Sequence, residues 1–202
     1  MAKSIRAKCK WLLRNISERL NHFRLNRKFG AVGMGTKVIG KVWLVDASNI
    51  FIGKNVKIGP FSRLETYSNY EGKNSNPQLI IGDSVSIQHA VHLYCNNYLE
   101  IQAGVLIASG CMITDNNHGT DPLGNYYENQ PLKSYPTLIK KGVWLGENVS
   151  VLAGSIIGER SIIGANSVVR GEIPDYSVAV GNPARVIKQY NFETKAWEKV
   201  NE

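Results

Sequence analysis

An aliphatic residue returns at every sixth position over a thirty-residue stretch of this chain, from Ile139 to Val168. The stretch divides into five blocks of six residues: IKKGVW, LGENVS, VLAGSI, IGERSI and IGANSV. A period of six fits neither a simple alternating strand nor an amphipathic helix, whose apolar face recurs about every 3.6 residues. It does fit a hexapeptide β-helix, in which short strands coil and one aliphatic side chain fills the interior at each repeat. The pattern therefore predicts an all-β coil.

The same period returns upstream in three segments that are each three blocks long: residues 52–69, 81–98 and 101–118. Residues 70–80 and 119–138 break the period and are rich in Gly, Pro and Asn, which indicates loops. A long aperiodic loop inside a compact domain is usually functional. We expect a β-helix domain over residues 31–190 with these two loops extruded from its corners.

The segment 1–30 is expected to be a basic, amphipathic helical arm. Residues 1–28 hold nine Lys or Arg and one acid, which accounts for the whole formal net charge of +8. Apolar residues recur there at steps of three and four, as on one face of a helix. The face can lie on an anionic membrane surface or cover the open first turn of the coil, and the sequence leaves both interpretations open.

Residues 191–202 are predicted to form a short C-terminal helix, because their apolar residues can share one face. These residues are Phe192, Ala196, Trp197 and Val200.

The remaining composition favours a cytoplasmic protein that can associate peripherally with the inner face of the membrane. Cys9, Cys95 and Cys111 are an odd, widely spaced set, which argues against a disulfide framework and a cysteine-based zinc site. We find no long apolar run typical of a membrane span or a secretory signal. The basic arm carries little aromatic content, so charge alone does not favour a nucleic-acid partner.

Two motifs resemble those of the hexapeptide-repeat O-acetyltransferases, a group that includes galactoside, maltose, and capsule or lipopolysaccharide acetyltransferases. The run from Gly142 to Lys188 is similar to the family's terminal signature, and Asp115–Gly119, DNNHG, lies where the family places its catalytic histidine before a loop. The resemblance implies a left-handed parallel β-helix with three hexapeptides to a turn. It also implies a homotrimer with active sites between neighbouring coils, and acetyl transfer from acetyl-CoA, without a metal, to a sugar hydroxyl.

The resemblance assigns His118 as the general base. A neutral imidazole can take the proton of a sugar hydroxyl as the oxygen attacks a thioester carbonyl. Asp115, three residues earlier, is a candidate for orienting the ring, with an ordinary turn residue as the alternative. Gln88 and Asn96 lie where relatives contact the acceptor, although those relatives carry Asn and Asp there. The acceptor is expected to be a sugar or lipid-linked glycan of a surface polysaccharide pathway, and its identity and the length of the acyl chain stay open.

For the cofactor, Trp144 matches a family position beside the pantetheine arm, and Glu147 and Ala165 match positions that contact CoA through their backbone. Arg170 and Arg185 are the cationic candidates for its phosphates, since a guanidinium suits phosphate geometry. Many relatives have Thr-Lys where this chain has Arg170-Gly171.

Two alternatives use the same fold. A metalloenzyme of the carbonic-anhydrase type needs convergent histidine ligands; His89 and His92 fall in a different repeat from His118. A non-catalytic β-helix scaffold would need neither a histidine at the catalytic place nor the terminal signature.

Overall fold

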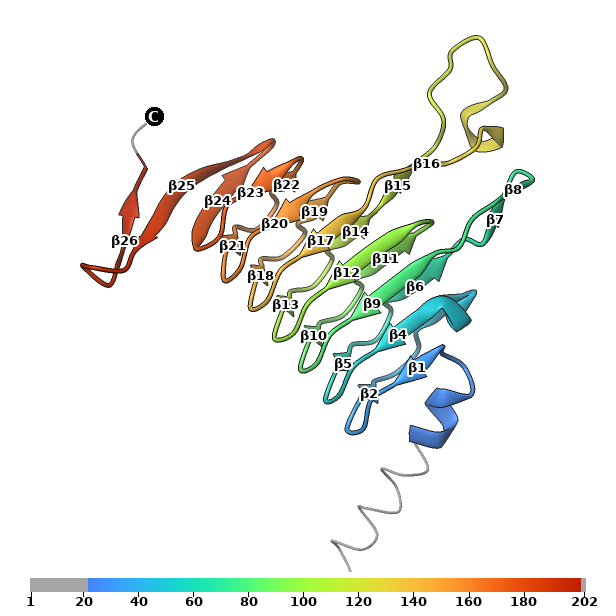
Figure 1. The fold of residues 1–202 in the computed structure, drawn as a ribbon, viewed down its shortest axis with the longest axis horizontal. Helices are drawn as coiled ribbons and strands as arrows, with labels where there is room; N and C mark the ends of the chain where they lie inside the picture. Colours follow the sequence, from blue (N-terminus) through green and yellow to red (C-terminus); the bar gives the residue numbers. More distant parts are fainter. Residues whose placement is uncertain (1–21, 201–202) are drawn as a thin grey trace, which may run out of the picture.

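The structure is a computed structural model that describes residues 22–200, and it shows a three-sided coil of short strands (Figure 1). Within each of the three long sheets the strands of successive turns pair in parallel, as in β12 on β17, β13 on β18 and β14 on β19. The turns stack in chain order from one end of the coil to the other (Figure 1). The fold is a left-handed parallel β-helix, so the predicted fold class is confirmed.

The sheets are named A, B and C in the order in which the chain first enters them. Sheet A contains β1 (Ala31–Val32), β4 (Ile50–Ile52), β9 (Gln78–Ile81), β12 (Tyr98–Ile101), β17 (Thr137–Ile139), β20 (Ile156–Ile157) and β23 (Glu172–Ile173). Sheet B contains β2 (Lys37–Val38), β5 (Lys57–Ile58), β10 (Ser86–Ile87), β13 (Leu106–Ile107), β18 (Trp144–Leu145), β21 (Ile162–Ile163), β24 (Ser177–Gly181), β25 (Ala184–Asn191) and β26 (Ala196–Lys199). Sheet C contains β3 (Trp43–Val45), β6 (Arg63–Thr66), β11 (His92–Cys95), β14 (Met112–Thr114), β19 (Ser150–Val151) and β22 (Val168–Val169). Two antiparallel pairs lie outside the coil, β7 (Asn69–Tyr70) with β8 (Lys73–Asn74) and β15 (Asn116–Asn117) with β16 (Lys133–Ser134), and two 3₁₀ turns are η1 (Ala47–Asn49) and η2 (Tyr127–Asn129).

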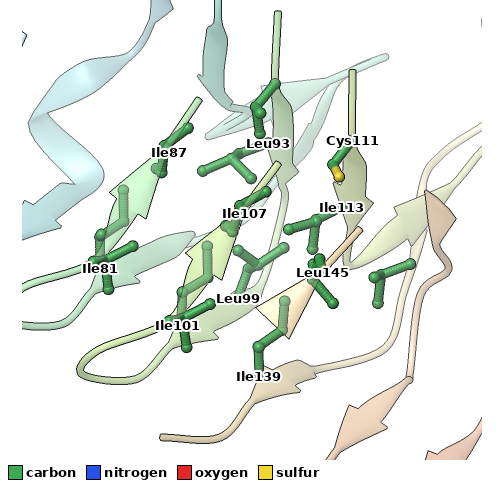
Figure 2. Packing of buried hydrophobic residues seen from close by; sticks show 14 of the residues in the cluster. Ile81, Ile87, Leu93, Leu99, Ile101, Ile107, Cys111, Ile113, Ile139 and Leu145 are labelled. Atoms are coloured by element: carbon green, nitrogen blue, oxygen red, sulfur yellow. The ribbon is translucent and has the colours of Figure 1, made fainter. Parts of the chain in front are cut away.

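One aliphatic side chain from each repeat stacks on the equivalent side chain of the next turn. In sheet B, Ile107 pairs with Leu145, and Leu145 pairs with Ile163 eighteen residues later. Eighteen residues are three repeats, so this turn contains one repeat for each sheet. Figure 2 shows Ile107 and Leu145 in the interior, and all three side chains are fully buried. Full burial of one such side chain contributes roughly 1.5–3 kcal/mol, which explains why the period is kept along the coil.

The corners explain the small residues of each repeat. At the second position, a Cβ on Gly146 would lie 2.7 Å from the backbone nitrogen of Ala165 in the next turn, so a larger residue would push the turns apart. At the fourth position the backbone is left-handed, with φ of 68° at Gly142 and 55° at Asn148. Gly and Asn adopt this conformation at the least cost, which is why they recur there.

The N-terminal end of the coil is covered by the last part of the predicted helical arm. Residues 22–26 are helical, and most of the predicted arm, 1–30, lies outside the described residues. The Asn26 side-chain oxygen accepts a hydrogen bond from the Val32 backbone N–H at 3.0 Å, and His22 Nε2 lies 2.9 Å from the Val32 carbonyl. Phe29 is buried against the first turn. These contacts fit the capping interpretation for residues 22–29.

The predicted C-terminal helix over 191–202 is wrong. Residues 184–199 form β25 and β26, which extend sheet B as an antiparallel hairpin. Tyr190 pairs with Trp197 across the hairpin, and the rings of Tyr190 and Phe192 pack edge to face at 5.2 Å. Without β25, strand β24 would have an unpaired edge, and the hydrogen bonds that β25 forms along this edge outweigh the weak helical period of a short sequence.

Candidate active site

Two loops leave the coil at the same corner, where the chain passes from sheet C to sheet A. The first is the hairpin β7–β8, and the second leaves through β15 and returns through β16 (Figure 1). One turn without an insertion lies between them and carries Asn96 and Asn97 at this corner. The breaks predicted at 70–80 and 119–138 correspond to these loops, although sheet A has already resumed at Gln78 and Thr137.

Asp115 lies fully buried at the base of the second loop. Its Oδ1 accepts a hydrogen bond from the backbone N–H of Asn96 at 2.8 Å, and its Oδ2 accepts one from the backbone N–H of Asn97 at 2.7 Å. The side-chain amide of Asn116 and the thiol of Cys95 complete its contacts. The carboxylate therefore ties the loop to the turn beneath it. This replaces the predicted contact with the His118 ring, because both oxygens face the corner below.

Asn96 is also part of this base, and its side chain is engaged with protein groups rather than left free for an acceptor. Its amide donates to the Tyr67 carbonyl at 2.8 Å and to Ser75 Oγ at 2.9 Å, at the stem of the β7–β8 hairpin. Its amide oxygen accepts from Ser134 Oγ, in β16, at 2.6 Å. Asn96 thus clamps the two loops together, so the prediction of an acceptor-binding side chain does not match its contacts.

His118 begins the outer part of the second loop and is exposed. Within the described residues, the one side chain hydrogen-bonded to its ring is Tyr70, whose hydroxyl oxygen lies 3.4 Å from Nδ1. The two rings meet edge to face with their centroids 5.6 Å apart. The Tyr70 hydroxyl also donates to the Glu128 carbonyl at 2.8 Å. His118 is therefore held on one side by the β7–β8 hairpin, while its Nε2 is left without a protein partner among residues 22–200.

Two hollows adjoin at His118. One, of about 450 Å³, extends from His118 over the outer face of sheet C. The other, of about 520 Å³, lies on the loop side between Gly119, Lys133 and Tyr135. Asn117 and His118 are the residues common to both linings. A group bound in either hollow would lie against the same imidazole.

The wall of the first hollow contains residues that the sequence analysis did not predict. They are Arg63, which is paired with Glu65, and the tyrosines Tyr67, Tyr70 and Tyr94. Arg63 Nε donates to the buried carboxylate of Glu65 at 2.7 Å, and the Tyr67 hydroxyl donates to its other oxygen at 2.6 Å. Burial and then the bond to Glu65 raise the pKa of Tyr67 above its ordinary range, so the hydroxyl stays protonated. Two features of the sequence indicate this wall. Arg63 precedes the aliphatic Leu64 of its repeat, so its side chain is expected to point outward, and Tyr70 is the first residue of the aperiodic segment 70–80.

The remaining predicted residues lie mostly at another corner, where sheet B passes to sheet C. Glu147 and Ala165 occupy this corner in successive turns and are exposed, and Gln88 occupies it lower in the coil. Trp144, 48% exposed, projects from the outer face of sheet B just before the same corner. Arg185 is the second residue of β25 and pairs with Val180 of β24. These residues share a side of the coil that does not contain His118.

Arg170 is the exception among the CoA candidates. It follows β22 at the corner between sheets C and A, the corner that carries His118 two turns earlier. Within one chain, the predicted site residues therefore lie at two separate corners, one between sheets B and C and the other between sheets C and A.

Comparison with known proteins identifies the family. The bacterial transferase hexapeptide model, which comprises six repeats, matches residues 136–171. The putative lipopolysaccharide biosynthesis O-acetyl transferase WbbJ of Escherichia coli K12 is 40% identical over 158 residues, covering 75% of this chain and 77% of WbbJ. The chain belongs to the hexapeptide-repeat acetyltransferase family. It is an acyltransferase, as the resemblance in its sequence predicts.

The acetyltransferase also matches sugar-modifying relatives over shorter ranges. A dTDP-3-amino-3,6-dideoxy-alpha-D-galactopyranose 3-N-acetyltransferase of Aneurinibacillus thermoaerophilus is 54% identical over 50 residues, which are 25% of this chain and 26% of that protein. Among solved structures, the N-acyltransferase AntD of Bacillus cereus, in complex with a dTDP-amino sugar and coenzyme A, superimposes with a TM-score of 0.70 at 24% identity, over 85% of this chain and 89% of AntD. The acetyltransferase VCA0836 of Vibrio cholerae, in complex with acetyl-CoA, gives 0.57 at 23% identity, over 81% and 72% of the two chains. At these identities the solved structures support the fold.

Residues 22–200 contain no cluster of three or more His, Cys, Asp or Glu side chains arranged to hold a metal ion. His89 is hydrogen-bonded to Ser109 at 2.9 Å and His92 lies 3.3 Å from the Tyr94 hydroxyl, each apart from His118. This geometry does not favour the metalloenzyme alternative. In the same part of the chain, no helix has the length and hydropathy needed to cross a bilayer.

The hydrogen bonds by which Asp115 ties the second loop to the turn below predict that Asp115→Asn destabilises the protein. The new amide would face one of two buried backbone N–H groups with a donor, at a cost of about 1–3 kcal/mol in the free energy of unfolding. We expect a lower midpoint in urea and faster amide exchange at Asn96, Asn97 and Tyr135. Asp121→Asn, on an exposed carboxylate of the same loop, is the matched control. Unchanged stability combined with a large loss of turnover would instead favour the ring-orienting role.

Proposed function

We propose that this acetyltransferase moves an acetyl group from acetyl-CoA to a hydroxyl of a sugar or glycan, in the biosynthesis of a surface polysaccharide or lipopolysaccharide. His118 is the general base. The observation that carries the proposal is the position of His118, exposed between two adjoining hollows. Transfer between two substrates needs such a meeting point, because both must reach the same base. The similarity to WbbJ supports the O-acetyl transfer and its pathway.

The imidazole carries out one proton transfer in each direction. The neutral ring of His118 accepts the proton of the acceptor hydroxyl while that oxygen forms a bond to the acetyl carbonyl carbon. When the carbon–sulfur bond breaks, the ring returns the proton to the leaving thiolate. The proton balance then closes without a covalent enzyme intermediate, and neither step needs a metal ion. Backbone N–H groups at the coil corners are candidates to stabilise the oxyanion between the two steps.

The acceptor occupies the hollow over sheet C. Its wall combines the faces of Tyr67, Tyr70 and Tyr94 with the apolar side chains of Met112 and Leu132. Aromatic and apolar surface with a few polar groups is typical of sites for small molecules, and it suits the mixed faces of a sugar ring. The charge of Arg63 is paired with Glu65, which favours an uncharged sugar unit next to His118.

Acetyl-CoA lies along the corner between sheets B and C, on Trp144, Glu147, Ala165 and Arg185, and Arg170 contributes from the corner between sheets C and A. Gln88, lower at the first of these corners, contacts the acceptor. Because these residues and His118 lie at different corners of one chain, we infer a homotrimer in which the base of one subunit faces the CoA corner of the next. The exposed indole of Trp144 and the exposed corners at Glu147 and Ala165 support a surface that a neighbour covers.

Replacement of the base tests the reaction assignment. We expect His118→Ala to keep its far-ultraviolet circular dichroism and unfolding midpoint but to lose at least about 100-fold in acetyl-CoA-dependent thiol release, the usual effect of a missing general base. The acceptors are a panel of nucleotide sugars and lipid-linked glycans. His22→Ala, which removes an imidazole near the first turn, is the control. Near-normal turnover of His118→Ala would rule out the base.

The basic segment supports a second part of the proposal, peripheral binding to the cytoplasmic face of an anionic membrane, where a lipid-linked acceptor would be found. Each Lys or Arg near such a surface contributes about 1 kcal/mol. Deletion of residues 1–21 keeps the contacts of His22 and Asn26 with the coil. We expect the full chain to sediment with vesicles containing phosphatidylglycerol in a salt-sensitive manner, and the truncated chain to stay in the supernatant. Equal sedimentation of both chains would refute a membrane role for the arm.

A further inference from the structure

Tyr70 reaches the active-site corner from a tight hairpin. Strands β7 and β8 are joined by the two residues Glu71 and Gly72, with φ of 48° and 74°. Positive φ at both residues is the geometry of the type I′ turn, which matches the twist of a two-residue hairpin. The stem is held by Ser75, whose N–H donates to the Ser68 carbonyl and whose hydroxyl donates to the Tyr67 carbonyl. Tyr70 thus projects from a braced element rather than from an open loop.

The hydroxyl of Tyr70 has one proton, and its geometry assigns that proton to Glu128. A backbone carbonyl can only accept, and the carbonyl oxygen of Glu128 lies 2.8 Å from the hydroxyl oxygen. The 3₁₀ turn η2 uses the carbonyls of Tyr126 and Tyr127 for its own hydrogen bonds, to the N–H groups of Asn129 and Gln130. The Glu128 carbonyl is therefore available to Tyr70.

Once this proton is directed to Glu128, the phenol oxygen can only accept from His118. Nδ1 lies 3.4 Å away, so a hydrogen bond there requires the proton to be on Nδ1. Burial raises the pKa of Tyr70, with the carboxylates of Glu71 and Glu128 as smaller causes, and the phenol stays neutral. In a neutral imidazole, a proton on Nδ1 leaves the lone pair on Nε2.

We propose that Tyr70 is a positioning residue that holds neutral His118 as the Nδ1–H tautomer. In this relay, His118 Nδ1–H donates to the Tyr70 oxygen, and the Tyr70 hydroxyl donates to the Glu128 carbonyl. The relay directs the basic Nε2 away from the hairpin. Its catalytic consequence rests on the proposed function, but the tautomer itself does not. The relay takes the place that the sequence had suggested for Asp115.

A second tyrosine–histidine pair shows why the relay is particular to Tyr70. The Tyr94 hydroxyl lies 3.3 Å from His92 Nδ1, and their rings also meet edge to face. Within the described residues, Tyr94 has no carbonyl acceptor like Glu128, so its proton is free to point to His92. The hydroxyl-to-Nδ1 distances of the two pairs are similar. Only in the Tyr70–His118 pair does a second acceptor, the Glu128 carbonyl, fix which group donates the hydrogen bond.

Nuclear magnetic resonance of the ring nitrogens tests the tautomer directly. The full chain is labelled with ¹⁵N-histidine and measured at about pH 9, where an ordinary imidazole is neutral, and His118→Asn assigns the His118 signals by their loss. We expect Nδ1 to be protonated and Nε2 unprotonated in the unmodified protein. A predominant Nε2–H form would overturn the relay, whatever the activity of the enzyme.

Tyr70→Phe then tests the consequence. Removal of the hydroxyl should shift His118 towards the Nε2–H form and lower kcat by roughly ten- to a hundredfold, with a smaller change in the KM for acetyl-CoA, since a misdirected ring is a poor base. Tyr126→Phe removes an exposed hydroxyl from the same loop and should change neither readout. An unchanged tautomer in Tyr70→Phe, or unchanged kcat, would overturn the positioning role. Failure of the proposed function would appear separately, as full activity in His118→Ala.

Discussion

The stacking of one buried aliphatic side chain on the next, turn after turn, is the constraint on which this structure depends. Ile107, Leu145 and Ile163 lie directly above one another in sheet B, and equivalent columns line sheets A and C. Because the columns fix the length of each side, every corner falls at a defined height and direction. Loops that differ in length can then leave one corner without disturbing the coil. The corner that carries the proposed active site is built in this way, from insertions placed two turns apart.

The polar base of that corner gives the loops their order. The Asp115 carboxylate accepts hydrogen bonds from the backbone N–H groups of Asn96 and Asn97. The Asn96 side chain forms hydrogen bonds to both the stem of the β7–β8 hairpin and β16. Buried polar groups stabilise a structure only when they are satisfied, and these donors and acceptors are matched. The exposed His118 and the half-buried Tyr70 are thereby placed on supported segments. An exposed imidazole on a loop of this length would otherwise sample many orientations, which would lower the rate of a reaction in which His118 has the proposed role of base.

The repeat makes the interior predictable from the sequence, because a period of six leaves few alternatives for Ile139, Leu145 or Val151. The contacts of Asp115 were not predictable, since an Asp before a loop is compatible with both a catalytic and a buttressing role. The choice depends on which backbone groups lie one turn below, and that turn spans 20 residues rather than 18, as the pairing of His92 with Met112 shows. Tyr70 was missed because its partner is 48 residues away in sequence, in a separate loop. The C-terminal hairpin was mistaken for a helix because a free sheet edge is invisible in the local pattern.

The division of the candidate site between two corners of one chain leads to the central claim, that base and CoA wall come from different subunits. Mixed trimers test it most directly. His118→Ala has no base, and Ala165→Trp blocks the CoA corner, so neither variant alone should turn over. After the two are unfolded and refolded together, we expect acetyl transfer to return in part, because some interfaces pair an intact His118 with an intact Ala165 corner. Absence of activity in trimers shown by native mass spectrometry to contain both variants would contradict the claim.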